Sequence, residues 1–73
     1  TTPLSSRALA GVSRQEHRVL TYVTDGYSNK QIGRSLGLSE STVKFHLRSL
    51  FRKLKVRSRG ELADAARSRG IAT

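Results

Sequence analysis

Three Ser-x-x-Glu or Ser-x-x-Gln motifs in a chain of 73 residues constrain its fold more than any other feature of the sequence. In this motif, the capping box, a serine hydroxyl and a carboxylate or amide satisfy backbone N–H groups that a helix leaves free at its start. The boxes begin at Ser13, Ser28 and Ser58. Ser39 is a further N-cap with an incomplete box, because Thr42 stands where Glu or Gln belongs. Four helix starts are therefore predicted.

Glycine followed by an apolar residue marks the expected helix ends. These pairs are Gly26-Tyr27, Gly37-Leu38 and Gly70-Ile71. The pattern is typical of Schellman caps, in which glycine is left-handed and the apolar residue folds back onto the last turn. Tyr27 is expected to face Tyr22. The predicted helices span residues 13–25, 28–36, 39–54 and 58–69.

Apolar side chains recur at helical spacing in these segments. In residues 39–54 they lie four, three and four positions apart, at Val43, Leu47, Leu50 and Leu54, which predicts one buried face. The other segments contribute Val19, Leu20 and Val23, then Ile32 and Leu36, then Leu62, Ala65 and Ala66. Because no strand-like alternation is present, the predicted fold class is all-α, a four-helix domain.

Length and composition favour a single domain. Residues 1–10 are small and polar and contain the single proline, so we interpret them as a linker from an upstream domain, with residues 11–73 as the folded domain. The chain begins without methionine and is expected to be a fragment, although removal of the initiator methionine gives the same start. With no cysteine and two separated histidines, no metal site and no cofactor are predicted.

The charge balance points to a polyanionic partner. Fourteen Lys and Arg residues oppose five Asp and Glu residues, which gives a formal net charge of +9. A solvated basic face is the alternative, and composition alone does not exclude it. No apolar run approaches the roughly 20 residues that span a bilayer, and no secretory pattern is present, so a cytoplasmic protein with no membrane partner is expected.

The second and third predicted helices are joined by Gly37 and Leu38, a connection so short that the chain must turn sharply. Two short helices around a tight glycine-containing turn, the second helix basic on its outer side, form the helix-turn-helix arrangement that places a helix in the major groove of DNA. Opposite the apolar stripe of this third helix lie Ser41, Lys44, Phe45, Arg48 and Arg52.

Lys44, Phe45 and Arg48 are the predicted base contacts. Lysine and arginine donate to guanine O6 and N7, and an aromatic ring contacts the thymine methyl group. Phe45 has an alternative role, in which it packs against the first helix or against a second copy of the chain.

Phosphate contacts are predicted at helix starts and at one basic junction. Asn29 and Lys30 begin the second helix, where free N–H groups and the helix dipole favour an anion. Ser41 and Thr42 stand at the equivalent place on the third helix, where capping is an equal alternative. His46 is assigned either a phosphate contact or a semi-buried structural role. Residues 52–59 supply the remaining candidates: Arg52, Lys53, Lys55, Arg57, Ser58 and Arg59.

Three stretches together resemble a known family. They are Gly26-Tyr27-Ser28-Asn29-Lys30-Gln31-Ile32, Leu36-Gly37-Leu38-Ser39-Glu40-Ser41-Thr42-Val43-Lys44-Phe45-His46-Leu47, and Lys53-Leu54-Lys55-Val56-Arg57-Ser58-Arg59-Gly60-Glu61-Leu62. They are similar to the LuxR/FixJ, NarL-type helix-turn-helix domains of bacterial transcription regulators, over about residues 12–66. The resemblance implies a four-helix DNA-binding domain whose third helix meets bases through Lys44, Phe45 and Arg48. It implies a dimer contact on the fourth helix, at Leu62, Ala65 and Ala66.

The resemblance also implies structural roles for Glu16, Leu20 and Gly26. Two positions depart from the usual family pattern: Gln15 replaces an arginine, and Gly33 replaces a small helix former such as alanine. Glycine in a helix is expected to cost roughly 1 kcal/mol relative to alanine.

The function expected from these features is sequence-specific binding of duplex DNA. The chain is interpreted as the C-terminal effector domain of a two-component response regulator or a ligand-sensing regulator, pairing as a homodimer. A protein-interaction module that binds a partner such as RNA polymerase is the second hypothesis. A third hypothesis, a basic helix that lies on a membrane surface, is disfavoured, because such a helix needs a wider apolar face than the narrow stripe of residues 39–54 offers. An enzyme is least favoured, because no paired base and nucleophile, metal set or phosphate-binding glycine loop is present, and His46 beside Ser49 forms no triad.

Overall fold

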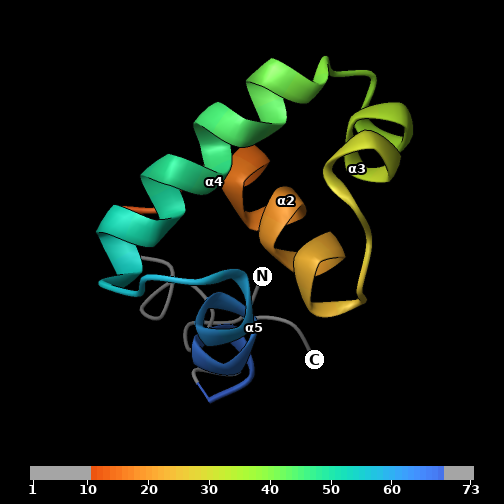
Figure 1. Ribbon diagram of the computed structural model, residues 1–73. Coiled ribbons are helices and arrows are strands. Elements are labelled where there is room, and N and C mark those ends of the chain that lie inside the picture. Colours follow the sequence, from red (N-terminus) through yellow and green to blue (C-terminus); the bar gives the residue numbers. More distant parts are fainter. Residues whose placement is uncertain (1–10, 69–73) are drawn as a thin grey trace.

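The computed structural model describes residues 11–68, in which four helices and no strand occur. They are α2 (Arg14–Thr24), α3 (Asn29–Leu36), α4 (Glu40–Leu54) and α5 (Arg59–Ser68) (Figure 1). The all-α prediction is confirmed, and each described helix end lies close to its predicted position. The predicted linker, residues 1–10, and the predicted Gly70-Ile71 cap lie outside the described residues.

Two of the three predicted capping boxes form in full. At α2, the Ser13 hydroxyl accepts the Glu16 N–H at 3.1 Å, and the Glu16 carboxylate accepts the Ser13 N–H at 2.9 Å. Ser28 and Gln31 make the same pair of bonds at α3, at 3.2 and 2.9 Å. These bonds fix where the first two helices of the described chain begin.

The other two helix starts are capped differently. Ser39 accepts the Thr42 N–H at 3.1 Å, as an N-cap without a box. At α5 the Ser58 hydroxyl accepts the Glu61 N–H at 3.1 Å, but the Glu61 carboxylate accepts the N–H of Arg57 instead of that of Ser58. The predicted third box is therefore only half formed, because Glu61 reaches one residue further back along the chain.

The helix ends include one that the glycine pattern did not predict. Gly26 and Gly37 are left-handed, with φ of 86° and 71°, and the rings of Tyr22 and Tyr27 lie 4.8 Å apart, as expected. Helix α4 ends on Lys55, whose φ is 57°. A Schellman cap forms there without glycine, and the Val56 N–H donates to the Phe51 carbonyl at 3.0 Å.

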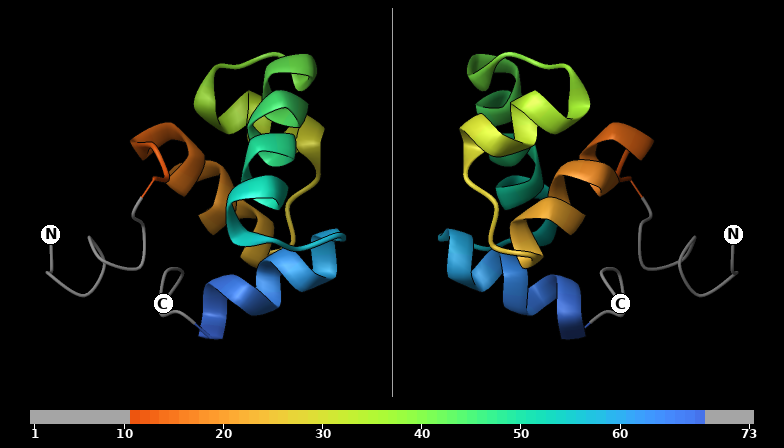
Figure 2. Two further views of the ribbon diagram at one scale, coloured as in Figure 1. Left: turned by 90° about the vertical axis from the view of Figure 1, so that its left-hand side faces the viewer. Right: turned by 90° about the vertical axis from the view of Figure 1, so that its right-hand side faces the viewer.

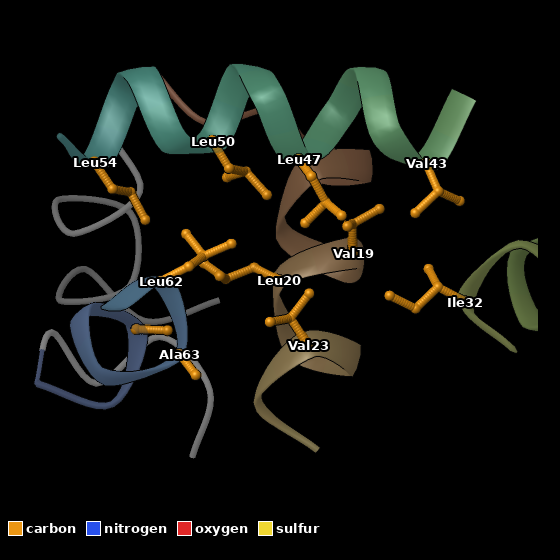
Figure 3. Close-up of a cluster of buried hydrophobic side chains, with 11 residues drawn as sticks. Val19, Leu20, Val23, Ile32, Val43, Leu47, Leu50, Leu54, Leu62 and Ala63 are labelled. Atoms are coloured by element: carbon orange, nitrogen blue, oxygen red, sulfur yellow. The ribbon is translucent and has the colours of Figure 1, made fainter. Parts of the chain in front are cut away.

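The core lies where α2, α4 and α5 meet, with α3 packed against the first half of α4 (Figures 1 and 3). The predicted stripe of α4 is buried along its whole length, and Leu20 of α2 lies near Leu62 of α5 beneath it (Figure 3). On α5 the buried set is Leu62, Ala63 and Ala66, whereas Ala65 is half-buried. The face of α5 that meets the core is therefore rotated from the predicted one.

The turn between α3 and α4 passes close to Gly33. The Gly33 carbonyl accepts the Leu38 N–H at 2.8 Å, and a Cβ added to Gly33 would lie 2.5 Å from the Leu38 carbonyl oxygen. That separation is shorter than a methyl group tolerates. Gly33 is thus a packing residue of the turn, and the expectation that it merely weakens its helix was incomplete.

Candidate nucleic-acid interface

The outer face of α4 presents an exposed strip of mixed chemistry. Lys44, Phe45 and Arg48 are all exposed there, and they come from the helix whose opposite face is buried in the core. Because that opposite face anchors α4 rigidly, the strip has a defined position relative to the rest of the domain. Ser41 and Arg52 extend the exposed strip at its two ends.

Phe45 is 67% exposed, although large apolar side chains usually find cover. Its ring meets the half-buried ring of His46 edge-on, with the two centroids 5.8 Å apart. The alternative in which Phe45 packs against the first helix, α2, was wrong. The alternative in which a second copy of the chain covers it stays a prediction.

Lys44 and Arg48 form a ridge between two hollows. One hollow is completed by Ser41 and Phe45. The other lies between α3, α4 and α5, and we name it the Arg59 hollow. Its lining consists of Asn29, Lys44, Leu47, Arg48, Phe51 and Arg59.

Arg59 ties the start of α5 to the start of α3. Its Nη1 donates to Asn29 Oδ1 at 2.6 Å, and its Nη2 donates to the backbone carbonyl of Tyr27. Figure 2 shows the first turn of α5 beside the connection that leads from α2 into α3. Arg59 and Asn29 were each predicted to contact phosphate. The bond between them was not predicted, because they lie 30 positions apart in the sequence.

Lys53 has an acidic partner inside the domain. Its Nζ donates to Glu16 Oε1 at 2.7 Å, which links α4 to α2. Glu16 is only 5% exposed, and burial alone would raise the pKa of its carboxyl group. Hydrogen bonds from Lys53, the Ser49 hydroxyl and the Ser13 N–H, together with the charge of Lys53, outweigh burial and lower that pKa to about 2.

The predicted phosphate residues therefore differ in what else they contact. Lys53 is engaged by a carboxylate, and we leave it out of the candidate set. Two hydroxyls take part in capping: Ser58 accepts the Glu61 N–H, and Thr42 Oγ1 lies 2.9 Å from Ser39 Oγ. Five other predicted residues are exposed: Lys30, Ser41, Arg52, Lys55 and Arg57.

Two of the three residues predicted to form the dimer contact are inside the domain. Leu62 and Ala66 are wholly buried, while Ala65 keeps part of its surface exposed. The prediction was wrong for Leu62 and Ala66, because the narrow apolar face of α5 is used to cover α2. A side chain with no exposed surface provides no contact to a second copy unless the domain opens.

Two other kinds of feature, a membrane-spanning helix and a metal-binding cluster, are absent from the described residues. Over residues 11–68, every helix is too short or too polar to cross a membrane. In the same part of the chain, no three histidine or acidic side chains come together in a way that could hold a metal ion.

Comparison with known proteins supports the same fold. Residues 10–66 match the family of bacterial regulatory proteins called the luxR family. A putative HTH-type transcriptional regulator of Escherichia coli K12, YhjB, is 44% identical over 64 residues, which are 86% of this chain and 32% of that protein. The nitrate/nitrite response regulator NarP of the same organism is 52% identical over 48 residues, 66% of this chain and 22% of NarP.

A third relative is the transcriptional regulatory protein DegU of Brevibacillus brevis, 46% identical over 48 residues, 66% of this chain and 20% of DegU. No solved structure matches the chain significantly. The chain spans a third or less of the length of these relatives. It belongs to the luxR family of bacterial regulatory proteins, and it is a helix-turn-helix domain of the kind found in transcription regulators.

Proposed function

We propose that the domain binds duplex DNA in a sequence-specific manner by placing α4 in the major groove. The observation that supports this most directly is the exposed strip of Lys44, Phe45 and Arg48, on a helix whose other face is buried. A helix fits the major groove, where each base pair shows a distinct pattern of donors and acceptors.

The strip matches that pattern chemically. Lys44 and Arg48 supply donors for guanine O6 and N7, and Phe45 supplies an apolar surface for the methyl group of thymine. The exposed Phe45 ring favours a binding strip over a merely solvated basic face, because exposing an apolar ring to water is unfavourable.

Exposed cations around the strip hold the duplex by its backbone. Lys30, Arg52, Lys55 and Arg57 are exposed and stand on α3, on α4 or just after α4. Contacts of this type fix the register of a domain on DNA without reading sequence, and they weaken as salt concentration rises.

The domain acts, in this proposal, as the C-terminal effector of a longer bacterial regulator in the cytoplasm, with a sensing domain upstream. Relatives named as response regulators favour a two-component system over a ligand-sensing one. Two copies then bind paired half-sites as a homodimer, and the DNA-bound dimer contacts RNA polymerase. The family consists of transcription regulators and not of enzymes, and no catalytic role is proposed.

Salt titrations of fluorescence anisotropy test the proposal, with a 20-base-pair duplex selected from a random library and a scrambled duplex of equal composition. We expect steep salt dependence on both duplexes and tighter binding to the selected one. Lys44→Ala or Arg48→Ala should weaken binding to the selected duplex about tenfold to a hundredfold, and binding to the scrambled one much less.

Lys30→Ala is the matched control, because it removes the same charge from an exposed position outside the strip. This variant should weaken binding to both duplexes alike, and it should lower the slope of log affinity against log salt concentration by about 1. Equal effects of Lys44→Ala and Lys30→Ala would argue against base contacts by α4. If neither duplex binds at low salt, the protein-interaction hypothesis takes precedence.

A further inference from the structure

The Arg59 hollow has the composition of an anion site. Of its six lining residues, Lys44, Arg48 and Arg59 are cationic, and none is acidic. Like charges that share one hollow repel each other, and an anion placed among them removes that repulsion. The hollow therefore favours a negatively charged occupant.

Arg59 differs from Lys53 in the charge of its partners. Lys53 is bonded to the carboxylate of Glu16, whereas Arg59 is bonded to an amide oxygen and a backbone carbonyl, both neutral. A guanidinium group has five N–H donors, and these bonds use two of them. Arg59 thus keeps its net charge and further donors, while Asn29 and the Tyr27 carbonyl hold its orientation.

Apart from these three cations and Asn29, the lining is apolar. Leu47 and Phe51 form the part of the hollow that belongs to the inner side of α4. An inorganic phosphate ion makes no use of such a surface. The backbone of DNA alternates phosphates with deoxyribose, whose carbon atoms pack against apolar side chains.

We propose that the Arg59 hollow is the seat of one DNA backbone phosphate, with Arg59 as its oriented donor and Asn29 as the residue that positions Arg59. This inference rests on the proposed function, since it assigns a backbone contact beside the base-contacting ridge of Lys44 and Arg48. The phosphate and the bases then contact neighbouring sides of the same ridge, which couples the register of α4 to one point on the DNA strand.

A phosphate scan tests the proposal on the 73-residue chain. In the selected duplex, single phosphates are replaced one at a time by neutral methylphosphonates, and affinity is measured at fixed salt. For the wild-type chain, one position per bound domain should weaken binding about tenfold, as expected for a charge-assisted hydrogen bond. In Arg59→Gln the same replacement should change affinity less than twofold, because the partner is already absent.

Asn29→Asp separates this role from a structural one. A carboxylate at this position keeps the bond to Arg59 and suits the first turn of a helix, so the tie between α3 and α5 is retained. It also neutralises Arg59, and the effect of the methylphosphonate should disappear. Gln31→Glu is the matched control, because it adds the same charge in the same turn, keeps an oxygen that accepts the Ser28 N–H, and does not line the hollow.

The outcomes are distinct. Loss of the phosphate effect in Asn29→Asp with its retention in Gln31→Glu supports the proposal. The wild-type chain could prefer the selected duplex while no methylphosphonate position has an effect that depends on Arg59. In that case the proposed phosphate site is wrong, while the proposed function stands. If inorganic phosphate alone saturates the hollow at constant ionic strength, seen as shifts of the Arg59 side-chain NMR signals, the site is one for free anions and the proposal fails.

Discussion

At the level of single residues, Gly33 shows how a sequence departure acquires a different meaning in three dimensions. Helix propensity treats the glycine as a loss of roughly 1 kcal/mol relative to alanine. In the structure, the Leu38 carbonyl oxygen occupies the space in which a methyl group would lie, 2.5 Å from the ideal Cβ position. The glycine lets the turn into α4 pass closer to α3 than an alanine allows.

Gly33→Ala should therefore not stabilise the domain. The gain in helix propensity is offset by the displacement of backbone that the methyl group forces, a type of overpacking that costs about 1–3 kcal/mol. Chemical denaturation should show an unfolding free energy equal to or below that of the wild type, and NMR shifts should change at Leu38 and Ser39. A gain of about 1 kcal/mol with an unmoved turn would contradict this account.

Among the helices, α4 has an unusual end, because a lysine and not a glycine takes the left-handed position. Lys55 stands in the left-handed conformation that Cβ atoms disfavour, and it is also an exposed candidate for phosphate contact. A glycine would relieve the strain, as it does at Gly37 at the end of α3. Lys55 therefore combines a proposed phosphate contact with a strained helix end.

Lys55→Gly should raise the unfolding free energy by about 0.5 to 1 kcal/mol, the relief of left-handed strain minus the extra freedom of glycine in the unfolded chain. The same variant should bind DNA more weakly, with a salt slope reduced by about 1. Lys55→Ala is the control, since it loses the charge but keeps the Cβ. Equal stability of the glycine and alanine variants would show that the cap is not strained.

Local signals account for what the sequence could predict. Ser13, Ser28 and Ser39 cap helices through bonds to residues three positions away, so the pattern alone identifies them. The pairing of Arg59 with Asn29 spans 30 positions and that of Lys53 with Glu16 spans 37, and no local pattern contains either pair. The wrong prediction of Leu62 as a dimer contact has the same origin, because the path of α5 across α2 decides which side of α5 is covered.

For the molecule as a whole, the network around Glu16 joins the two longest described helices, α2 and α4. Its carboxyl group has a folded pKa of about 2 against an ordinary value of 4.5. Because the folded pKa is depressed, the stabilisation is complete above pH 4.5 and is lost as the pH falls towards 2. The difference corresponds to about 3 kcal/mol.

The unfolding free energies of the wild-type chain and of Glu16→Gln should therefore differ most near neutral pH and become similar in acid. We expect the wild type to lose about 3 kcal/mol of unfolding free energy between pH 5 and pH 2 beyond any loss in the variant, measured by urea denaturation at constant ionic strength. At pH 5 the variant should have the lower unfolding free energy, because it lacks the ion pair to Lys53 at every pH. Parallel curves for the two proteins would mean that exposed carboxylates, and not the buried link between α2 and α4, control acid stability.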